Sequence, residues 1–179
     1  MTKRLPLLLS AAMAGGLVLA AASAAGQSTM DSKKPSAGAD TKFVMDAAKG
    51  GVAEVEMGRL AADKGSNPDV KRFGQRMVDD HSKANDELKA IASGKGITVA
   101  SDLDAADKKQ KDQWSKMSGA AFDKSYMADM VKDHKKDVAE FKKEAASGKD
   151  PDVKAFAAKT LPTLEDHLKM AEETYAKVK

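Results

Sequence analysis

FGQRMVDDHSKANDEL (residues 73–88) and YMADMVKDHKKDVAEF (residues 126–141) are two versions of one pattern, and they decide the fold. Aligned without gaps, they place His81 over His134, and each histidine follows an aspartate. In both stretches apolar residues recur at spacings of three and four, which is the period of one face of an α-helix. The sequence therefore predicts two similar helices whose histidines lie on the inward face.

A longer repeat contains these stretches. The segment Pro68-Asp69-Val70-Lys71-x-Phe73 matches Pro151-Asp152-Val153-Lys154-x-Phe156, and a glycine-containing stop precedes each proline. Proline is favourable in the first turn of a helix, where its missing N–H would have no intrahelical partner. The repeat predicts a helical hairpin that occurs twice, with helices at 40–64, 68–93, 121–147 and 151–178.

The two hairpins are joined by a connection of roughly 25 residues, in which a short helix is expected at 102–116. Trp114 lies near the end of this helix and is expected to pack over one end of the core. Two helical hairpins joined by one long crossover make the ferritin-like form of the four-helix bundle. The predicted fold class is therefore all-α, a ferritin-like antiparallel four-helix bundle formed by residues 40–179.

The N-terminus indicates an exported protein. Lys3 and Arg4 precede an uncharged run rich in Leu, Ala and Gly, and Ala22-Ser23-Ala24 has the small-x-small form of a signal-peptide cleavage site. We expect residues 1–24 to be a signal peptide, residues 25–39 to be a disordered leader, and the mature chain to be periplasmic. The alternative is that the apolar run remains as an N-terminal membrane anchor, and no later segment has the roughly 20 apolar residues of a transmembrane helix.

The composition argues against several classes of protein. The chain has no cysteine, so the exported domain must depend on its core and not on disulfides. Removing Lys3 and Arg4 from the 30 basic residues leaves 28 against 27 acidic ones, and aromatic residues make up 4%. Such a mixed surface with few stacking side chains argues against a nucleic-acid-binding protein. Because no thiol is present and no serine can be argued to face a histidine, no enzymatic activity is predicted.

Four polar residues lie near the middle of the four long predicted helices and on their inward faces: Glu54, His81, His134 and His167. The midpoints of antiparallel helices meet at one level, so we expect a single polar layer across an apolar core. A buried carboxylate needs compensation by a protonated histidine, a hydrogen-bond network or a metal ion. Three imidazoles and one carboxylate form a ligand set suited to zinc, copper or iron. The sequence therefore predicts a metal site at these four residues.

Three methionines lie one helical turn from the histidines: Met77, Met130 and Met170. Thioether and imidazole ligands together favour Cu(I). Methionine at helical spacing is also a common filler of apolar cores, so these three residues are weaker candidates.

The di-iron motif of ferritin-like proteins is missing. That site needs Glu-x-x-His on two helices, whereas an apolar residue stands three positions before each of the three histidines. Two functions stay open. One is an exported protein that binds a transition metal for storage, buffering or stress protection. The alternative is a non-catalytic protein of envelope interaction or stress protection, whose Glu/His layer only fixes the register of the helices.

Several segments carry a resemblance to a known family: Phe43-Val44 with Ala47-Ala48-x-Gly50-Gly51-x-x-Glu54-Val55, Met77-Val78-x-Asp80-His81-x-x-Ala84-Asn85, Phe122-Asp123-x-x-Tyr126, Met130-Val131-x-Asp133-His134, and Leu161-Pro162-Thr163-Leu164-x-x-His167-Leu168. They resemble the exported bacterial family DUF4142, a domain of unknown function placed in the ferritin-like superfamily. The resemblance covers residues 40–178. It implies a ferritin-like bundle and no established activity. Relatives often carry the label of outer membrane proteins, but no integral-membrane role is inferred from that label.

Overall fold

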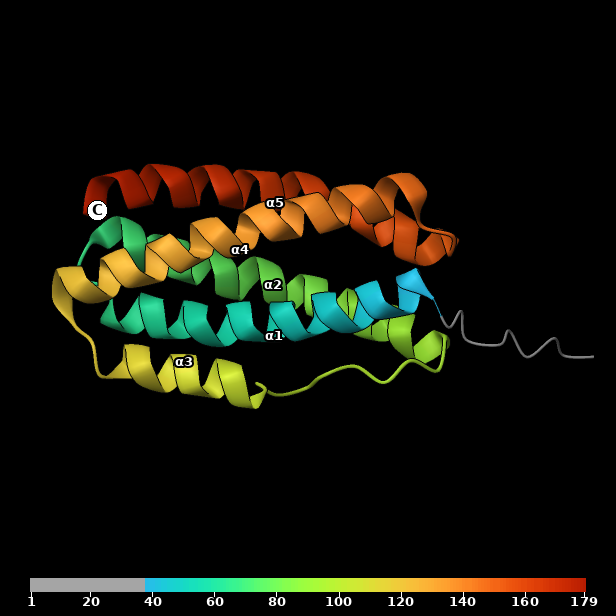
Figure 1. Ribbon diagram of the computed structural model, residues 1–179, viewed down its shortest axis with the longest axis horizontal. Helices are drawn as coiled ribbons and strands as arrows, with labels where there is room; N and C mark the ends of the chain where they lie inside the picture. Colours follow the sequence, from blue (N-terminus) through green and yellow to red (C-terminus); the bar gives the residue numbers. More distant parts are fainter. Residues whose placement is uncertain (1–37) are drawn as a thin grey trace, which may run out of the picture. The chain divides into compact units, whose positions relative to one another are not determined.

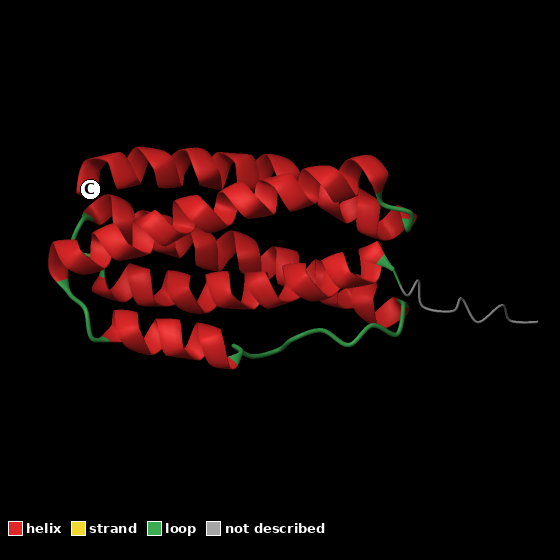
Figure 2. Ribbon diagram, in the orientation of Figure 1, coloured by secondary structure: helices red, strands yellow, loops and turns green. Residues whose placement is uncertain are grey.

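The computed structural model of the chain describes residues 38–179, which form helices and no strand (Figure 2). The helices are α1 (Ala39–Lys64), α2 (Pro68–Gly94), α3 (Ala105–Ser115), α4 (Gly119–Ser147) and α5 (Pro151–Val178). The prediction of an all-α fold is confirmed, and every boundary lies within three residues of its expected place. The predicted signal peptide and residues 25–37 of the predicted leader lie outside the described residues, whereas Ala39 is already the first residue of α1.

The four long helices pack in two pairs (Figure 1). Helix α1 lies along α2 and α4 lies along α5, while α2 contacts α5 and α1 contacts α4. The chain reverses within each pair over the short loops 65–67 and 148–150. The long connection 95–118 joins the pairs and carries α3, which packs against α1 and α4. None of the helices within residues 38–179 is long and apolar enough to cross a membrane.

Two apolar clusters form the core. Cluster A is built around Phe73, Trp114, Phe122 and Tyr126. Cluster B is built around Phe43, Leu88, Phe141 and Phe156. The Trp114 side chain is 1% exposed, packs edge-on against Tyr126 and donates a hydrogen bond to the Ser125 hydroxyl. Trp114 therefore anchors the end of α3 to cluster A, in line with its expected packing role.

Helices α1 and α2 touch backbone to backbone at Gly58 and Gly74. A Cβ atom at Gly74 would lie 2.6 Å from the Gly58 carbonyl oxygen and 2.7 Å from the Ala62 nitrogen. The two helices therefore approach closely at these glycines. At Gly50, by contrast, a Cβ atom would meet no atom of the described chain within 4 Å.

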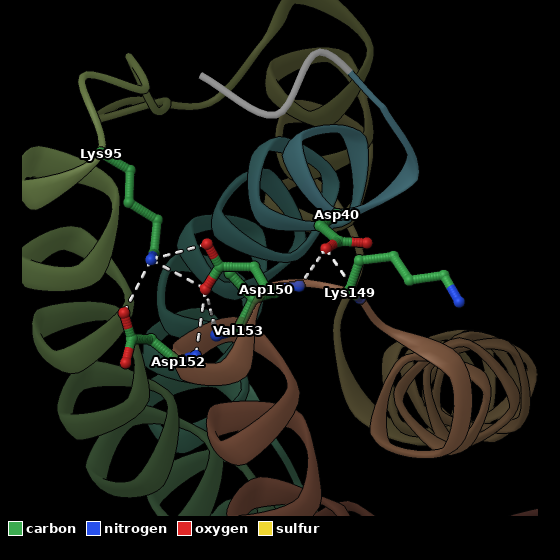
Figure 3. Close-up of polar contacts among 6 residues, drawn as sticks. All are labelled: Asp40, Lys95, Lys149, Asp150, Asp152 and Val153. Atoms are coloured by element: carbon green, nitrogen blue, oxygen red, sulfur yellow. Dashed lines mark hydrogen bonds and ion pairs between the residues drawn. The ribbon is translucent and has the colours of Figure 1, made fainter. Parts of the chain in front are cut away.

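A buried aspartate from α1 holds the turn between α4 and α5. The Asp40 carboxylate accepts hydrogen bonds from the backbone N–H groups of Lys149 at 2.9 Å and Asp150 at 2.6 Å (Figure 3). Lys95, just after α2, forms an ion pair with Asp150 at 2.7 Å. Asp40 does not cap its own helix, since Gly38 occupies the cap position and Asp40 reaches the other hairpin instead.

The turn between α1 and α2 is held in the same way by an aspartate from α4. Asp123 is 1% exposed and accepts hydrogen bonds from the backbone N–H groups of Ser66 at 2.9 Å and Asn67 at 2.8 Å, and from the Ser66 hydroxyl at 2.5 Å. Each pair of helices thus fixes the turn of the other pair. This exchange sets the height of one hairpin relative to the other.

Replacing Gly74 with alanine should lower the free energy of unfolding by about 2 kcal/mol, because the new Cβ atom forces two backbones apart. The matched control Gly50→Ala should leave it unchanged or raise it by up to about 1 kcal/mol, since alanine favours the helix and meets open space. Urea unfolding measures both. Equal effects at the two positions would contradict the close crossing of α1 and α2.

Replacing Asp123 with alanine should lower the free energy of unfolding by about 2–4 kcal/mol, because three hydrogen bonds to a buried carboxylate are lost and the turn between α1 and α2 loses its tie to α4. The exposed Asp86 on α2 provides the control, and Asp86→Ala should stay within about 0.5 kcal/mol of the wild type. Thermal or urea unfolding gives the comparison, and a loss below about 1 kcal/mol at Asp123 would show that its turn holds without it.

Candidate metal centre

The polar residues predicted from the sequence fall between the two apolar clusters on each long helix. On α2, His81 lies between Met77 of cluster A and Leu88 of cluster B. The same order holds for the other three: Glu54 on α1, His134 on α4 and His167 on α5. All four are buried, with exposed fractions of 7% or less. A polar layer therefore separates two apolar halves of the core.

The three histidine rings meet in this layer. Their ring centroids lie 5.4 to 5.9 Å apart. One ring nitrogen from each of His81, His134 and His167 lies within 4.8 Å of the corresponding nitrogens of the other two. Tetrahedral zinc with Zn–N bonds of about 2.1 Å separates its ligand nitrogens by about 3.4 Å. The rings thus come from three helices to within a small movement of metal-binding distance.

Hydrogen bonds fix the tautomers of two of these rings. His134 Nδ1 lies 2.9 Å from the Met130 carbonyl oxygen, which only accepts, so Nδ1 carries the proton. His167 Nε2 lies 2.9 Å from the Asp80 carboxylate on α2, so Nε2 is the donor in that neutral ring. A histidine whose second nitrogen donates to a carboxylate or carbonyl is the usual arrangement around a protein-bound metal.

Each ring also presents a second nitrogen that has no hydrogen-bond partner among residues 38–179: His81 Nε2, His134 Nε2 and His167 Nδ1. We call these the open nitrogens. In His134 and His167 the tautomers leave a lone pair on the open nitrogen. Buried polar atoms in folded proteins are nearly always hydrogen-bonded, so three such atoms in one layer require an explanation.

Burial keeps the imidazoles neutral. Desolvation lowers the pKa of His81 to about 3, with a further contribution from the two neighbouring rings. It also lowers the pKa of His167 to about 4, against the opposing effect of the Asp80 hydrogen bond, and lowers that of His134. Neutral imidazole is the form that binds metal ions, so the site is ready to bind at neutral pH without losing protons.

Glu54 lies beside the histidines but outside their group. Its Oε1 atom is 3.9 Å from His134 Nδ1, the nitrogen that already donates to the Met130 carbonyl. Burial, aided by the charges of Asp133 and Asp129, raises the pKa of Glu54 to about 8. The structure therefore brings three of the four predicted ligands together and places the fourth at the edge of the layer.

The methionines named from the sequence lie among apolar side chains. Met77 and Met130 are buried in cluster A, and Met170 packs against it while half-buried. Their positions are accounted for by core packing.

Two acidic residues near the layer were not among the ligands predicted from the sequence. Asp80 directs His167, and its signal is the repeated Asp-His pair, in which the aspartate serves a histidine of another helix. Asp137 lies one turn after His134, and burial together with the Glu54 charge raises its pKa to about 7. The spacing of three residues from His134 was the available signal for Asp137.

Comparisons with known proteins place the chain in context. The sequence profile of a family described as "Domain of unknown function (DUF4142)" matches residues 24–174. A solved structure, the DUF305 fragment from Deinococcus radiodurans, is similar with a TM-score of 0.66 and 10% sequence identity, over 77% of this chain and 95% of that chain. At this identity the likeness concerns the fold alone. No curated protein matches the sequence.

The neutral state of His81 makes the stability of the metal-free protein depend on pH. Its pKa is about 3 in the folded chain against 6.5 for the free side chain. The contribution of the neutral ring is therefore present above pH 6.5 and is lost as the pH falls from 6.5 towards 3. When the pH falls from 7 to 5, the unfolding free energy of the wild type should drop by about 2 kcal/mol more than that of His81→Asn, which has no imidazole at this position.

Urea unfolding of metal-free protein at the two pH values gives this difference. Ser82→Ala, the adjacent position, is the control and should follow the wild type in parallel at both pH values. If the unfolding free energies of wild type and His81→Asn differ by the same amount at pH 7 and pH 5, His81 is protonated inside the fold as readily as in the unfolded chain.

Proposed function

We propose that this chain binds one transition-metal ion through His81, His134 and His167. The chain belongs to the DUF4142 family, as the resemblance of its motifs implied. Binding, and not catalysis, is the proposed activity. It serves storage, buffering or protection of the cell from metal stress.

The observation that carries the proposal is the set of open nitrogens. Three neutral imidazoles converge from three helices, and each keeps one buried nitrogen without a hydrogen-bond partner in the described chain. A metal ion is a ligand that engages three such nitrogens at once, with the neutral His81 ring in the tautomer that leaves its Nε2 unprotonated. The hydrogen bonds from His134 to Met130 and from His167 to Asp80 hold two of the rings in the tautomer that this requires.

The ligand set selects the class of ion. Imidazole suits zinc, copper, iron and nickel, whereas calcium and magnesium prefer oxygen ligands. Three nitrogens leave one position of a tetrahedral ion for water or for a further side chain. Glu54 lies nearby and can balance part of the positive charge by releasing its proton when the ion binds. We propose Zn(II) or Cu(II) as the resident ion, with iron disfavoured by the missing Glu-x-x-His motifs.

The alternative function, a purely structural Glu/His layer, has less support. A layer that only fixes the helix register gains most when its polar members are hydrogen-bonded to one another. Here no hydrogen bond joins one histidine to another or to Glu54 within residues 38–179, although their rings lie 5.4 to 5.9 Å apart.

The finer features of the fold and location belong to the same proposal. The two helix pairs, their short turns and the single long connection support a ferritin-like four-helix bundle. The basic start, the apolar run and the Ala22-Ser23-Ala24 site support export to the periplasm with removal of residues 1–24. The mass of the chain recovered from the periplasm tests this, because cleavage leaves Ala25 as the first residue.

Adding Zn(II) to the metal-free protein should stabilise it by about 2.7 kcal/mol when the free ion stands at 100 times its Kd. His134→Gln should abolish this stabilisation and keep the helix content of the wild type. Asp166→Ala, an exposed change next to His167, is the control and should keep the full shift. Thermal unfolding with and without Zn(II), repeated with Cu(II), measures all three proteins.

Two results would overturn the proposal. One is the absence of any shift with either ion in a protein that also carries no metal as isolated. The other is an equal shift in wild type and His134→Gln, which would place the bound ion elsewhere on the chain.

A further inference from the structure

A cavity of about 460 Å³ leads to the candidate metal centre from the side of α1 and α4. Residues of all five helices line it, and its lining includes both exposed side chains such as Asp46 and the buried side chains of Glu54 and His81. The cavity therefore extends from the surface to one of the three histidines.

Helix α1 forms one wall of this cavity with three residues at intervals of four: Asp46, Gly50 and Glu54. This spacing places them on one face of the helix, from the exposed to the buried end. A Cβ atom at Gly50 would meet no atom within 4 Å among the described residues. Glycine inside a helix costs about 1 kcal/mol relative to alanine, and close packing does not explain it here. The missing side chain leaves the space beside Glu54 open.

The lining of the cavity is acidic. Six acidic residues and three lysines line it, so a positive ion is favoured inside it over a negative one. The six are Asp46, Glu54, Asp107, Asp133, Asp137 and Glu140. Burial raises the pKa of Glu54 to about 8 and that of Asp137 to about 7, so these two groups can release a proton when a cation binds.

All three lysines are engaged: Lys42 pairs with Asp46, Lys49 lies 2.7 Å from Asp104 and Lys136 lies 3.8 Å from Glu140. The other four acidic residues of the lining form no ion pair with a lysine of the described chain: Glu54, Asp107, Asp133 and Asp137.

Two buried atoms at the inner end of the cavity point to a ligand independently of the charge. Glu54 Oε2 and His81 Nε2 have no hydrogen-bond partner within residues 38–179, and both side chains line the cavity. Their residues are 5% and 7% exposed. A cation that meets first a carboxylate oxygen and then an imidazole nitrogen can exchange its bound water molecules for protein ligands one at a time.

A second cavity of about 250 Å³ also reaches the histidines, between α2 and α5, where it is lined by His81 and His167. Its acidic residues are already bound: Asp80 to His167 at 2.9 Å, and Glu87 to Lys159 at 2.7 Å. The Glu87–Lys159 ion pair joins the two helices beside this cavity. The second cavity therefore offers a cation fewer available carboxylates than the first.

We propose that the larger cavity is the access route of a divalent cation to the histidines, with Gly50 keeping the route open and Glu54 receiving the ion before His81 binds it. This inference rests on the proposed metal binding and adds the path and the selectivity for cations. Acidic side chains concentrate positive ions in the cavity, and Glu54 replaces part of their hydration before they reach the buried rings.

Filling the route tests the proposal. Co(II) serves as the probe, because its visible absorption reports coordination by nitrogen and can be followed by stopped flow. Gly50→Phe should slow Co(II) association at least tenfold, while Gly50→Ala should stay within twofold of the wild type. The Kd should change little, because an obstructed path slows association and dissociation alike. Gly50→Leu, a smaller obstruction, should give an intermediate rate and guards against misfolding of the phenylalanine variant.

The charge of the route is tested by a matched pair of reversals. Asp46→Lys should lower the Co(II) association rate several-fold at low salt, and the effect should shrink at high salt. Asp79→Lys changes the net charge equally at an exposed position of α2 outside both cavities, and should leave the rate near that of the wild type.

The second cavity provides the competing arm. Thr163→Phe narrows it without touching the first and should leave the Co(II) association rate unchanged. The access route is wrong, while metal binding stands, if Thr163→Phe slows Co(II) association and the Gly50 variants do not. It is also wrong if the wild type binds Co(II) and every variant associates with Co(II) at the wild-type rate. If the wild type binds no Co(II), Zn(II) or Cu(II), both the proposed function and the access route are overturned.

Discussion

The rest of the structure depends on the removal of water from four polar side chains at the middle of the core. An imidazole or carboxyl group transferred from water to an apolar interior loses hydrogen bonds that the fold must replace. Here replacement is partial: Met130 and Asp80 engage one nitrogen each on His134 and His167, and the open nitrogens stay unpaired. The same desolvation lowers the pKa of the histidines and raises that of Glu54, so the layer is held uncharged.

Two apolar clusters and two buried aspartates hold these groups at one level. Clusters A and B close the layer from both ends, so a shift of one helix by a turn would move a polar residue into apolar surroundings. Asp40 and Asp123 each bind the turn of the opposite hairpin, which fixes the height of one pair of helices against the other. The convergence of one nitrogen from each of the three rings to within 4.8 Å follows from this register.

The polar layer and the cavity beside it lower the stability of the metal-free chain at several positions, and packing does not explain these positions. Three buried nitrogens lack partners within residues 38–179, and a mid-helix glycine faces open space beside an acidic cavity. Each of these features costs free energy in the metal-free chain. All of them become useful if a cation enters through the cavity and binds the rings. A ligand that binds only the folded state stabilises it by an amount that rises with the logarithm of its concentration relative to Kd, so metal binding would offset these local losses of stability.

The helices and their inward faces could be predicted from the sequence, because the three-and-four spacing of apolar residues and the glycine and proline stops are local properties of the chain. It also identified the histidines, since a polar residue in an apolar stripe is visible without coordinates. It missed that Asp40 reaches the opposite turn, that Gly50 opens a cavity, and that Glu54 lies at the edge of the histidine group. Those features depend on the relative height and rotation of separate helices, which the local period leaves undetermined. They come from the packed fold, because long-range packing and the pairing of buried polar groups set the distances between side chains that the sequence places far apart.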